Sequence, residues 1–292
     1  MRRGVETIAA GRKDVPYGTF TSYVAFDRGD EAQLRSAFDR VKPDVVLDLA
    51  CYRPLEAEAA IRNFKGERYV FVSSGAVYPD LNGRPAREED FVPLSGAAPD
   101  ALDYSDGKRW CETVFSRSAD FPWTVLRPPA VLGPGDPTLR VAAYLQRVAD
   151  GGPLLLPEES YERQAGLAWV KDIGYACALV CDLRKNTVQK AYNAAFEGVS
   201  VRSLVEGIAR ATGVPARIHL VPFGKLPEGA SPYGPDPRRS AGHSIERVRA
   251  ELGFEPSALE EALADTFAWF RVARPSHPGY ANRAAELALA GG

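Results

Sequence analysis

Residues 69–78 read YVFVSSGAVY, a run of apolar, strand-favouring residues that stops at two serines and a glycine. A run without polar alternation predicts a strand buried on both faces, which is typical of parallel sheets in α/β proteins. The neighbouring chain repeats this pattern. Further strands are predicted over residues 5–10, 20–26, 44–50 and 123–127, and helices over residues 30–41, 55–64 and 104–115. This alternation predicts an α/β fold with a doubly wound parallel sheet, in which ligands bind at the carboxyl ends of the strands.

The chain changes character after about residue 134. Helices are predicted over residues 139–149, 170–182, 200–212, 244–252 and 259–272, with strands over residues 190–195 and 217–221. Residues 222–237 are rich in proline and glycine, which predicts a long loop. We therefore expect residues 1–135 to form the α/β domain. Residues 136–292 are expected to form mainly a smaller, interleaved C-terminal lobe, with residues 165–196 returning to the first domain.

Composition narrows the possible functions. Lys and Arg number 36 and Asp and Glu number 38, which gives a net charge of −2 and no electrostatic reason to expect nucleic acid or an anionic membrane as a partner. Four cysteines form no disulfide framework and favour a reducing cytoplasm. Three histidines without ligand-like spacing argue against a zinc site. The most apolar stretch, residues 165–181, is interrupted by Lys171 and Asp172, so no membrane span is predicted.

Three motifs together indicate a catalytic site. SSGAVY (residues 73–78) follows a strand, YSDGK (residues 104–108) opens a helix, and LRPPAVLGPGD (residues 126–136) ends the next strand. Tyr104 and Lys108 lie one helical turn apart on one face, and theirs is the only Tyr-x-x-x-Lys pair in the chain. An ammonium beside a phenol favours the phenolate, which makes a tyrosine usable as an acid or base. A hydroxyl at the preceding strand end, that of Ser74, could hold a substrate oxygen beside it.

These motifs resemble the extended short-chain dehydrogenases/reductases of the NAD-dependent epimerase/dehydratase family. The resemblance covers nearly the whole chain and includes AYNAAF, residues 191–196, and LGFEP, residues 252–256. It implies a Rossmann-type dinucleotide-binding domain with a C-terminal substrate lobe. It also implies a catalytic set of Ser74, Tyr104 and Lys108. In this set Tyr104 exchanges a proton, Lys108 tunes Tyr104 and binds the nicotinamide ribose, and Ser74 orients the substrate oxygen.

The resemblance also implies cofactor contacts. Leu49, Ala50 and Cys51 would line the cofactor at a strand end, and Pro128 would lie near the nicotinamide. Asp27 would meet the adenine, although such a residue is by default a turn residue.

Two basic residues point to the choice of cofactor. Arg12 and Lys13 follow the strand predicted over residues 5–10, where an acidic residue would bind the ribose of NAD. A basic pair there suits the 2′-phosphate of NADP, although a solvated loop pair is an equally good interpretation. NADP or NAD is therefore the expected cofactor.

One expected element is absent from the sequence. Proteins of this family begin with a strand and a glycine-rich turn that receives the pyrophosphate at a helix N-terminus. The N-terminal glycines here, Gly4, Gly11, Gly18 and Gly29, lack that spacing. Without the first strand, the strands at residues 5–10 and 44–50 would each lose one neighbour. Either these strands close up, or another segment fills the gap, or the true start lies upstream of Met1. We favour the upstream start and expect weak dinucleotide binding by the chain as given.

The sequence therefore predicts an NAD(P)-dependent oxidoreductase or epimerase that acts on a hydroxyl or carbonyl carbon of a small molecule, with sugar nucleotides as the family's commonest substrates. Two alternatives stay open: a nucleic-acid-binding or regulatory protein on the same fold, and a lyase or cyclase that needs no cofactor. No membrane and no nucleic-acid partner is expected, and a homodimer is the candidate assembly.

Overall fold

The structure is a computed structural model that describes residues 4–12, 18, 20–227 and 241–291 of the chain. The chain folds into two compact units. The first comprises Met1–Val77, Pro93–Leu126 and Val180–Ala191, and the second comprises Tyr78–Val92, Arg127–Leu179 and Tyr192–Gly292. The assignment of residues 1–135 to a dinucleotide-binding domain and of residues 136–292 mainly to a substrate lobe stays a prediction.

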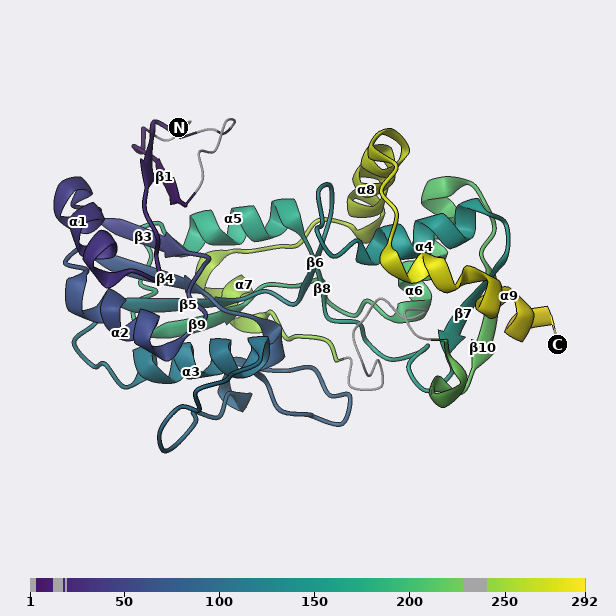
Figure 1. Cartoon of the computed structure of the whole chain (residues 1–292), viewed down its shortest axis with the longest axis horizontal. Helices are drawn as coiled ribbons and strands as arrows, with labels where there is room; N and C mark the ends of the chain where they lie inside the picture. The colour runs from purple at the N-terminus through teal and green to yellow at the C-terminus, as the bar shows by residue number, and fades with distance from the viewer. Residues whose placement is uncertain (1–3, 13–17, 19, 228–240, 292) are drawn as a thin grey trace. The chain divides into compact units, whose positions relative to one another are not determined.

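A four-stranded sheet forms the centre of the first unit, with strand order β3-β4-β5-β9 (Figure 1). Its strands are β3 (Val45–Asp48), β4 (Arg68–Val72), β5 (Trp123–Arg127) and β9 (Lys190–Asn193). β3 and β5 each pair with β4 in parallel. All five residues of β4 are buried, and the apolar run at residues 69–72 predicts this for four of them. The prediction of an α/β fold built on parallel strands is confirmed.

Three helices accompany this sheet: α1 (Glu31–Val41), α2 (Pro54–Asn63) and α3 (Tyr104–Ser116). α1 begins where Asp30 accepts hydrogen bonds from the backbone N–H groups of Ala32 and Gln33. α2 and α3 pack against each other on one side of the sheet (Figure 1). Their shared core is rich in aromatic rings, including an edge-to-face contact between Phe64 and Tyr69 at 5.4 Å.

Two N-terminal strands stand apart from this sheet. β1 (Ile8–Gly11) and β2 (Ser22–Ala25) pair in parallel with each other. Among the described residues neither strand pairs with β3, whose only ladder partner is β4. The alternative in which residues 5–10 and 44–50 close up against each other is therefore not seen. Leu47 and Leu49, on and just after β3, remain 39% and 59% exposed.

A side-chain network joins the loop after β2 to the end of β3. Arg28 donates to Asp48 Oδ2 at 2.7 Å and to the carbonyl oxygen of Glu56 at 3.0 Å. The hydroxyl of Tyr69 donates to the same Asp48 oxygen at 2.5 Å. Burial opposes the charge of Arg28, but neighbouring Tyr69 and Asp48 hold the pKa of Arg28 above its ordinary value. Side chains thus provide a connection that the backbone ladder does not.

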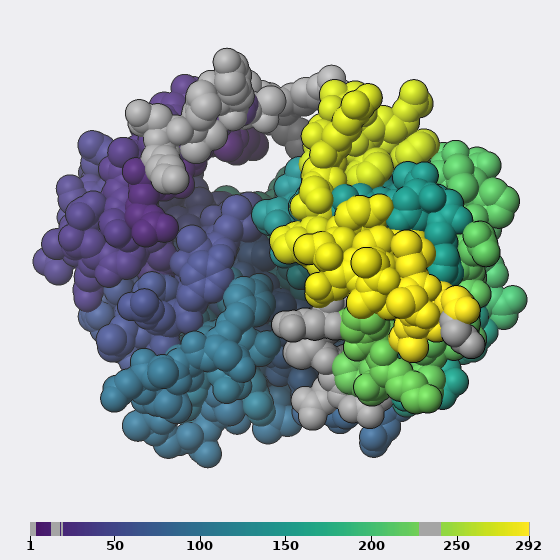
Figure 2. Space-filling model, turned by 45° about the vertical axis from the view of Figure 1, so that its right-hand side comes forward, coloured from purple at the N-terminus to yellow at the C-terminus, as the bar shows by residue number. Residues whose placement is uncertain are grey.

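The second unit contains two short parallel pairs and most of the remaining helices. β6 (Ala130–Leu132) pairs with β8 (Leu167–Trp169), and β7 (Pro153–Pro157) pairs with β10 (Arg217–Val221). The helices are α4 (Arg140–Ala149), α5 (Val170–Val180), α6 (Val201–Thr212), α7 (Glu246–Leu252), α8 (Leu259–Ala273) and α9 (Arg283–Gly291). Figure 2 shows α8 and α9 at the surface of this unit. The predicted loop at residues 222–237 lies largely outside the described residues.

A buried carboxylate in the second unit gives a pH-dependent prediction. Glu88 is 7% exposed and accepts a hydrogen bond from the backbone N–H of Asn193 at 2.8 Å. Burial raises the pKa of Glu88, and the Asn193 bond offsets this only in part. A carboxyl with a raised folded-state pKa stabilises the fold fully below its unfolded pKa, and this contribution is lost as pH rises through the folded value. We expect Glu88→Gln, which can accept the same hydrogen bond, to raise the melting temperature at pH 7.

Thermal melting of wild type and Glu88→Gln between pH 4 and pH 8 checks this expectation. The difference between the two proteins should shrink toward pH 4, where the wild-type carboxyl is protonated in both states. Glu158 is exposed, so Glu158→Gln serves as the matched control and should shift the melting temperature little at any pH. A Glu88→Gln protein that is less stable than wild type at pH 7 would contradict the interpretation.

Candidate active site

The end of β4 carries two buried serines. Ser73 and Ser74 are 3% and 8% exposed and lead into a short 3₁₀ helix, η1 (Gly75–Val77). The Ser74 hydroxyl accepts a hydrogen bond from the Ala76 N–H at 3.1 Å, which orients it at the start of this turn. The Ser73 hydroxyl donates to the buried carboxylate of Glu112 on α3. The strand end is thereby tied to the helix that presents Tyr104 and Lys108.

Helix α3 places Tyr104 and Lys108 in very different environments. Asp103 caps the helix by accepting from the N–H of Asp106 at 2.7 Å, so Tyr104 stands in the first turn. Tyr104 is 56% exposed, whereas Lys108 is 2% exposed. The Lys108 ammonium donates to the carbonyl oxygen of Val72 at 2.9 Å, and burial lowers the pKa of Lys108. The structure thus brings Lys108 to the strand end that leads into Ser74, while the catalytic roles of the three residues remain predictions.

Tyr52 is a residue of this site that the sequence analysis missed. It follows β3, and the centroid of its ring lies 4.3 Å from the Lys108 ammonium and 6.1 Å from the centroid of the Tyr104 ring. Desolvation raises the pKa of Tyr52, with Tyr104 as the next contributor. The signal that could have found Tyr52 is its place at the carboxyl end of a predicted parallel strand, where ligand-binding residues gather.

Gly107 lets α3 approach the segment that carries Tyr52. A Cβ atom at position 107 would lie 2.5 Å from the Tyr52 carbonyl oxygen, so any side chain there would displace the helix or the loop. The glycine of YSDGK is therefore required by close backbone approach.

Gly107→Ala is expected to lower the free energy of unfolding by about 1–3 kcal/mol, the usual cost of overpacking. The helical Gly174 on α5 provides the matched control, because nothing lies within 4 Å of its added Cβ. Gly174→Ala should instead stabilise the protein by about 0.5–1 kcal/mol. Urea denaturation measures the change in the free energy of unfolding for both variants. A stabilised Gly107→Ala protein would refute the close approach of Gly107 to the Tyr52 carbonyl.

The residues predicted to contact the adenosine end of a cofactor lie at the surface, in a turn or outside the described residues. Arg12 is exposed, and Lys13 lies outside the described residues. Asp27 accepts a hydrogen bond from the N–H of Gly29 at 2.8 Å and so acts as a turn residue in this structure. Roles of these residues toward a cofactor remain predictions.

The residues predicted to line the cofactor at strand ends differ in their burial. Leu49 and Ala50 are exposed after β3, whereas Cys51 is fully buried. The Cys51 sulfur lies 3.6 Å from that of Cys111 on α3, so its side chain packs in the core of the first unit. Pro128 is buried directly after β5 and belongs to the second unit. Their cofactor contacts likewise remain predictions.

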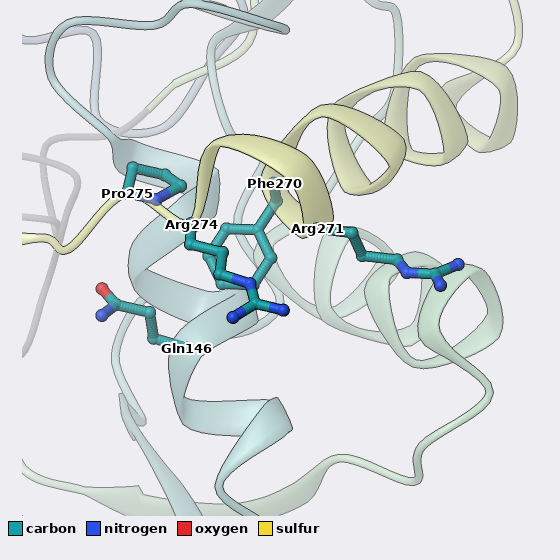
Figure 3. A pocket seen from close by; sticks show the side chains of 5 residues that line it. All are labelled: Gln146, Phe270, Arg271, Arg274 and Pro275. Carbon is teal, nitrogen blue, oxygen red and sulfur yellow. The ribbon is translucent and has the colours of Figure 1, made fainter.

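A separate hollow of about 460 Å³ lies in the second unit. Figure 3 shows its lining, in which the Arg271 side chain points away from those of Phe270 and Arg274. Gln146 and Pro275 complete the lining. None of the predicted site residues lines this hollow. Within the described ranges no group of His, Cys, Asp or Glu side chains is arranged to hold a metal ion, and no described helix is long and apolar enough to cross a membrane.

One known family matches the segment that carries the candidate site. The model of the NAD dependent epimerase/dehydratase family matches residues 53–195, which include Ser74, Tyr104 and Lys108. This segment of the chain is therefore similar to proteins of the NAD dependent epimerase/dehydratase family. A comparison with curated proteins gives no match.

Solved structures support the same fold over most of the chain. Epimerase Mth375 from Methanothermobacter thermautotrophicus is 20% identical with a TM-score of 0.68, over 93% of this chain and 86% of that chain. The enzyme WbmH from Bordetella bronchiseptica, in complex with NAD+, is 18% identical with a TM-score of 0.66, over 92% and 91%. UDP-glucuronic acid 4-epimerase from Bacillus cereus, in complex with NAD, is 16% identical with a TM-score of 0.64, over 88% and 82%. The predicted Rossmann-type fold is confirmed.

Proposed function

We infer that the protein is an NAD(P)-dependent oxidoreductase or epimerase that acts on a hydroxyl or carbonyl carbon. The observation that carries this proposal is the 2.9 Å hydrogen bond between Lys108 on α3 and Val72 at the end of β4. This bond sets the Tyr-x-x-x-Lys helix against the strand end that leads into Ser74. Bound nicotinamide supplies hydride transfer, which the side chains of proteins do not provide.

The residues present fit such a cofactor at one end. Lys108 and Tyr104 offer the donors that a nicotinamide ribose would need, and Ser74 offers a hydroxyl just after β4. The described residues contain no glycine-rich turn at a helix N-terminus, the usual site for a pyrophosphate. We therefore expect weak dinucleotide binding by this chain.

Each proposed role follows from the position of the residue. The exposed hydroxyl of Tyr104 would exchange a proton with the substrate oxygen as the bonded carbon gains or loses hydride. The buried Lys108 would hold the ribose and favour the phenolate form of the tyrosine. Ser74 would donate a hydrogen bond to the substrate oxygen and so orient it.

A nucleotide sugar is the proposed substrate class. Support comes from the fold shared with UDP-glucuronic acid 4-epimerase. We further propose a cytoplasmic location, which the four free cysteines support, and a homodimer as the assembly to test.

Titration with NAD and with NADP tests the proposal, followed by incubation of the loaded protein with UDP-glucuronic acid. We expect measurable binding, with NADP preferred because of Arg12 and Lys13. The double variant Arg12→Ala, Lys13→Ala should lose NADP affinity and keep NAD affinity. Failure of both dinucleotides to bind would refute the redox proposal, and an unchanged NADP affinity in the double variant would assign the basic pair to a solvated turn.

A further inference from the structure

The ring of Tyr52 covers the ammonium of Lys108. Its centroid lies 4.3 Å from Nζ, and the Phe71 ring lies at 4.8 Å. Among the described residues the only hydrogen-bond acceptor of this ammonium is the Val72 carbonyl. Lys108 is consequently 2% exposed, although Tyr52 and Tyr104 beside it are about half-exposed.

A ligand oxygen cannot bind Lys108 from the Tyr52 side while the ring stays in place. An acceptor oxygen needs to lie about 2.7–3.2 Å from an N–H donor nitrogen. That position falls between Nζ and the ring, whose centroid is only 4.3 Å away. The ring and the oxygen therefore exclude each other.

The backbone that carries this ring is held by hydrogen bonds, whereas the ring itself borders solvent. The N–H groups of Tyr52 and Arg53 both donate to Glu56 Oε2, at 2.8 and 3.1 Å, and Gly107 abuts the Tyr52 carbonyl. The side chain is 46% exposed, so rotation about its χ angles is open on the solvent side. Movement of the ring needs no movement of the loop.

We propose that Tyr52 is an access residue: its ring closes over Lys108 and must rotate away before a ligand oxygen reaches the ammonium. For the identity of that ligand, the hydroxyls of a nicotinamide ribose, the inference rests on the proposed function. Tyr52 then competes with the cofactor for Lys108, and the competition weakens cofactor binding. The cation–π contact that must be broken corresponds to about 3- to 30-fold in affinity.

Amine labelling tests the cover without any cofactor. Trinitrobenzenesulfonate is added to the 292-residue protein, and the labelled peptides are quantified by mass spectrometry, with the exposed Lys65 as internal reference. Lys108 should react slowly in wild type and in Tyr52→Phe, which keeps a ring, and much faster in Tyr52→Ala. Tyr175→Ala removes an equally exposed tyrosine from α5 and should leave Lys108 slow. Equal Lys108 labelling in wild type and Tyr52→Ala would overturn the proposal, provided that thermal melting shows both proteins folded.

Titration of the same variants with NAD and NADP tests the competition. Tyr52→Ala should bind the preferred dinucleotide about 3- to 30-fold more tightly than wild type, and Tyr52→Phe about equally to wild type. Weaker binding by Tyr52→Ala would make Tyr52 a ligand contact and overturn the proposal. If no variant binds either dinucleotide, the proposed function fails, and faster labelling of Lys108 in Tyr52→Ala still establishes the cover.

Discussion

Replacing Tyr104 with phenylalanine is expected to lower kcat by about 10²- to 10⁴-fold, the usual effect of losing a positioned acid or base. The hydroxyl is the only group removed, and it is the one proposed to exchange the proton. Tyr104 is 56% exposed in the first turn of α3, so the variant should keep the fold and melt near the wild-type temperature. Steady-state kinetics with loaded enzyme and nucleotide sugar measure the loss.

Cofactor affinity separates the chemical role of Tyr104 from a binding role. A proton-transfer residue should change kcat much more than the dissociation constant of the dinucleotide. Tyr175→Phe, which removes the hydroxyl of an exposed tyrosine on α5, is the control and should keep full activity. A folded Tyr104→Phe protein with near-normal turnover would eliminate the assigned mechanism.

Replacing Glu286 with alanine is expected to lower the free energy of unfolding by about 3–5 kcal/mol. Glu286 is fully buried on α9 and accepts from Arg147 Nε and from Arg283 Nη1, each at 2.8 Å. Its removal leaves the 2% exposed Arg147 without a counter-charge. The carbonyl of Ala143 would remain as an acceptor for Arg147, but a neutral oxygen does not compensate a buried charge. The net free energy of unfolding of a typical protein is only about 5–15 kcal/mol, so a loss of this size should be severe.

Equilibrium denaturation in urea measures this effect, and an exposed pair provides the comparison. Glu260 on α8 forms an ion pair of 2.9 Å with Arg210, and both side chains are more than half-exposed. Glu260→Ala should cost at most about 1 kcal/mol, because solvent screens the pair. Replacing Arg147 and Glu286 together, as Arg147→Met, Glu286→Leu, should recover much of the loss by removing both charges. If Glu286→Ala and Glu260→Ala lowered the free energy of unfolding equally, burial would not be what makes the Glu286 ion pair important.

Local signals predicted most of the elements. The strands at residues 123–127 and 217–221 have the observed bounds of β5 and β10, and the helix expected at residues 30–41 is α1 with Asp30 as its cap. No local pattern predicted β6, β7, β8 or α9. β6 and β8 have three residues each, too few for a periodic pattern, and β7 is PLLLP, whose prolines suggest a loop. The alanine-rich α9 has a weak apolar face and is held instead by buried charges.

The sequence by itself determined the pairing of Tyr104 with Lys108, because residues four apart on a helix share a face whatever the rest of the chain does. It also determined the buried parallel strand before Ser74, because an unbroken apolar run has few other solutions. Only the tertiary structure decided that Cys51 packs against Cys111 in the core and that Tyr52 covers Lys108. Each of these contacts joins residues more than fifty positions apart, so no local pattern encodes it. It arises only once α3 has packed against the segment that follows β3, where Gly107 sets how closely the two approach.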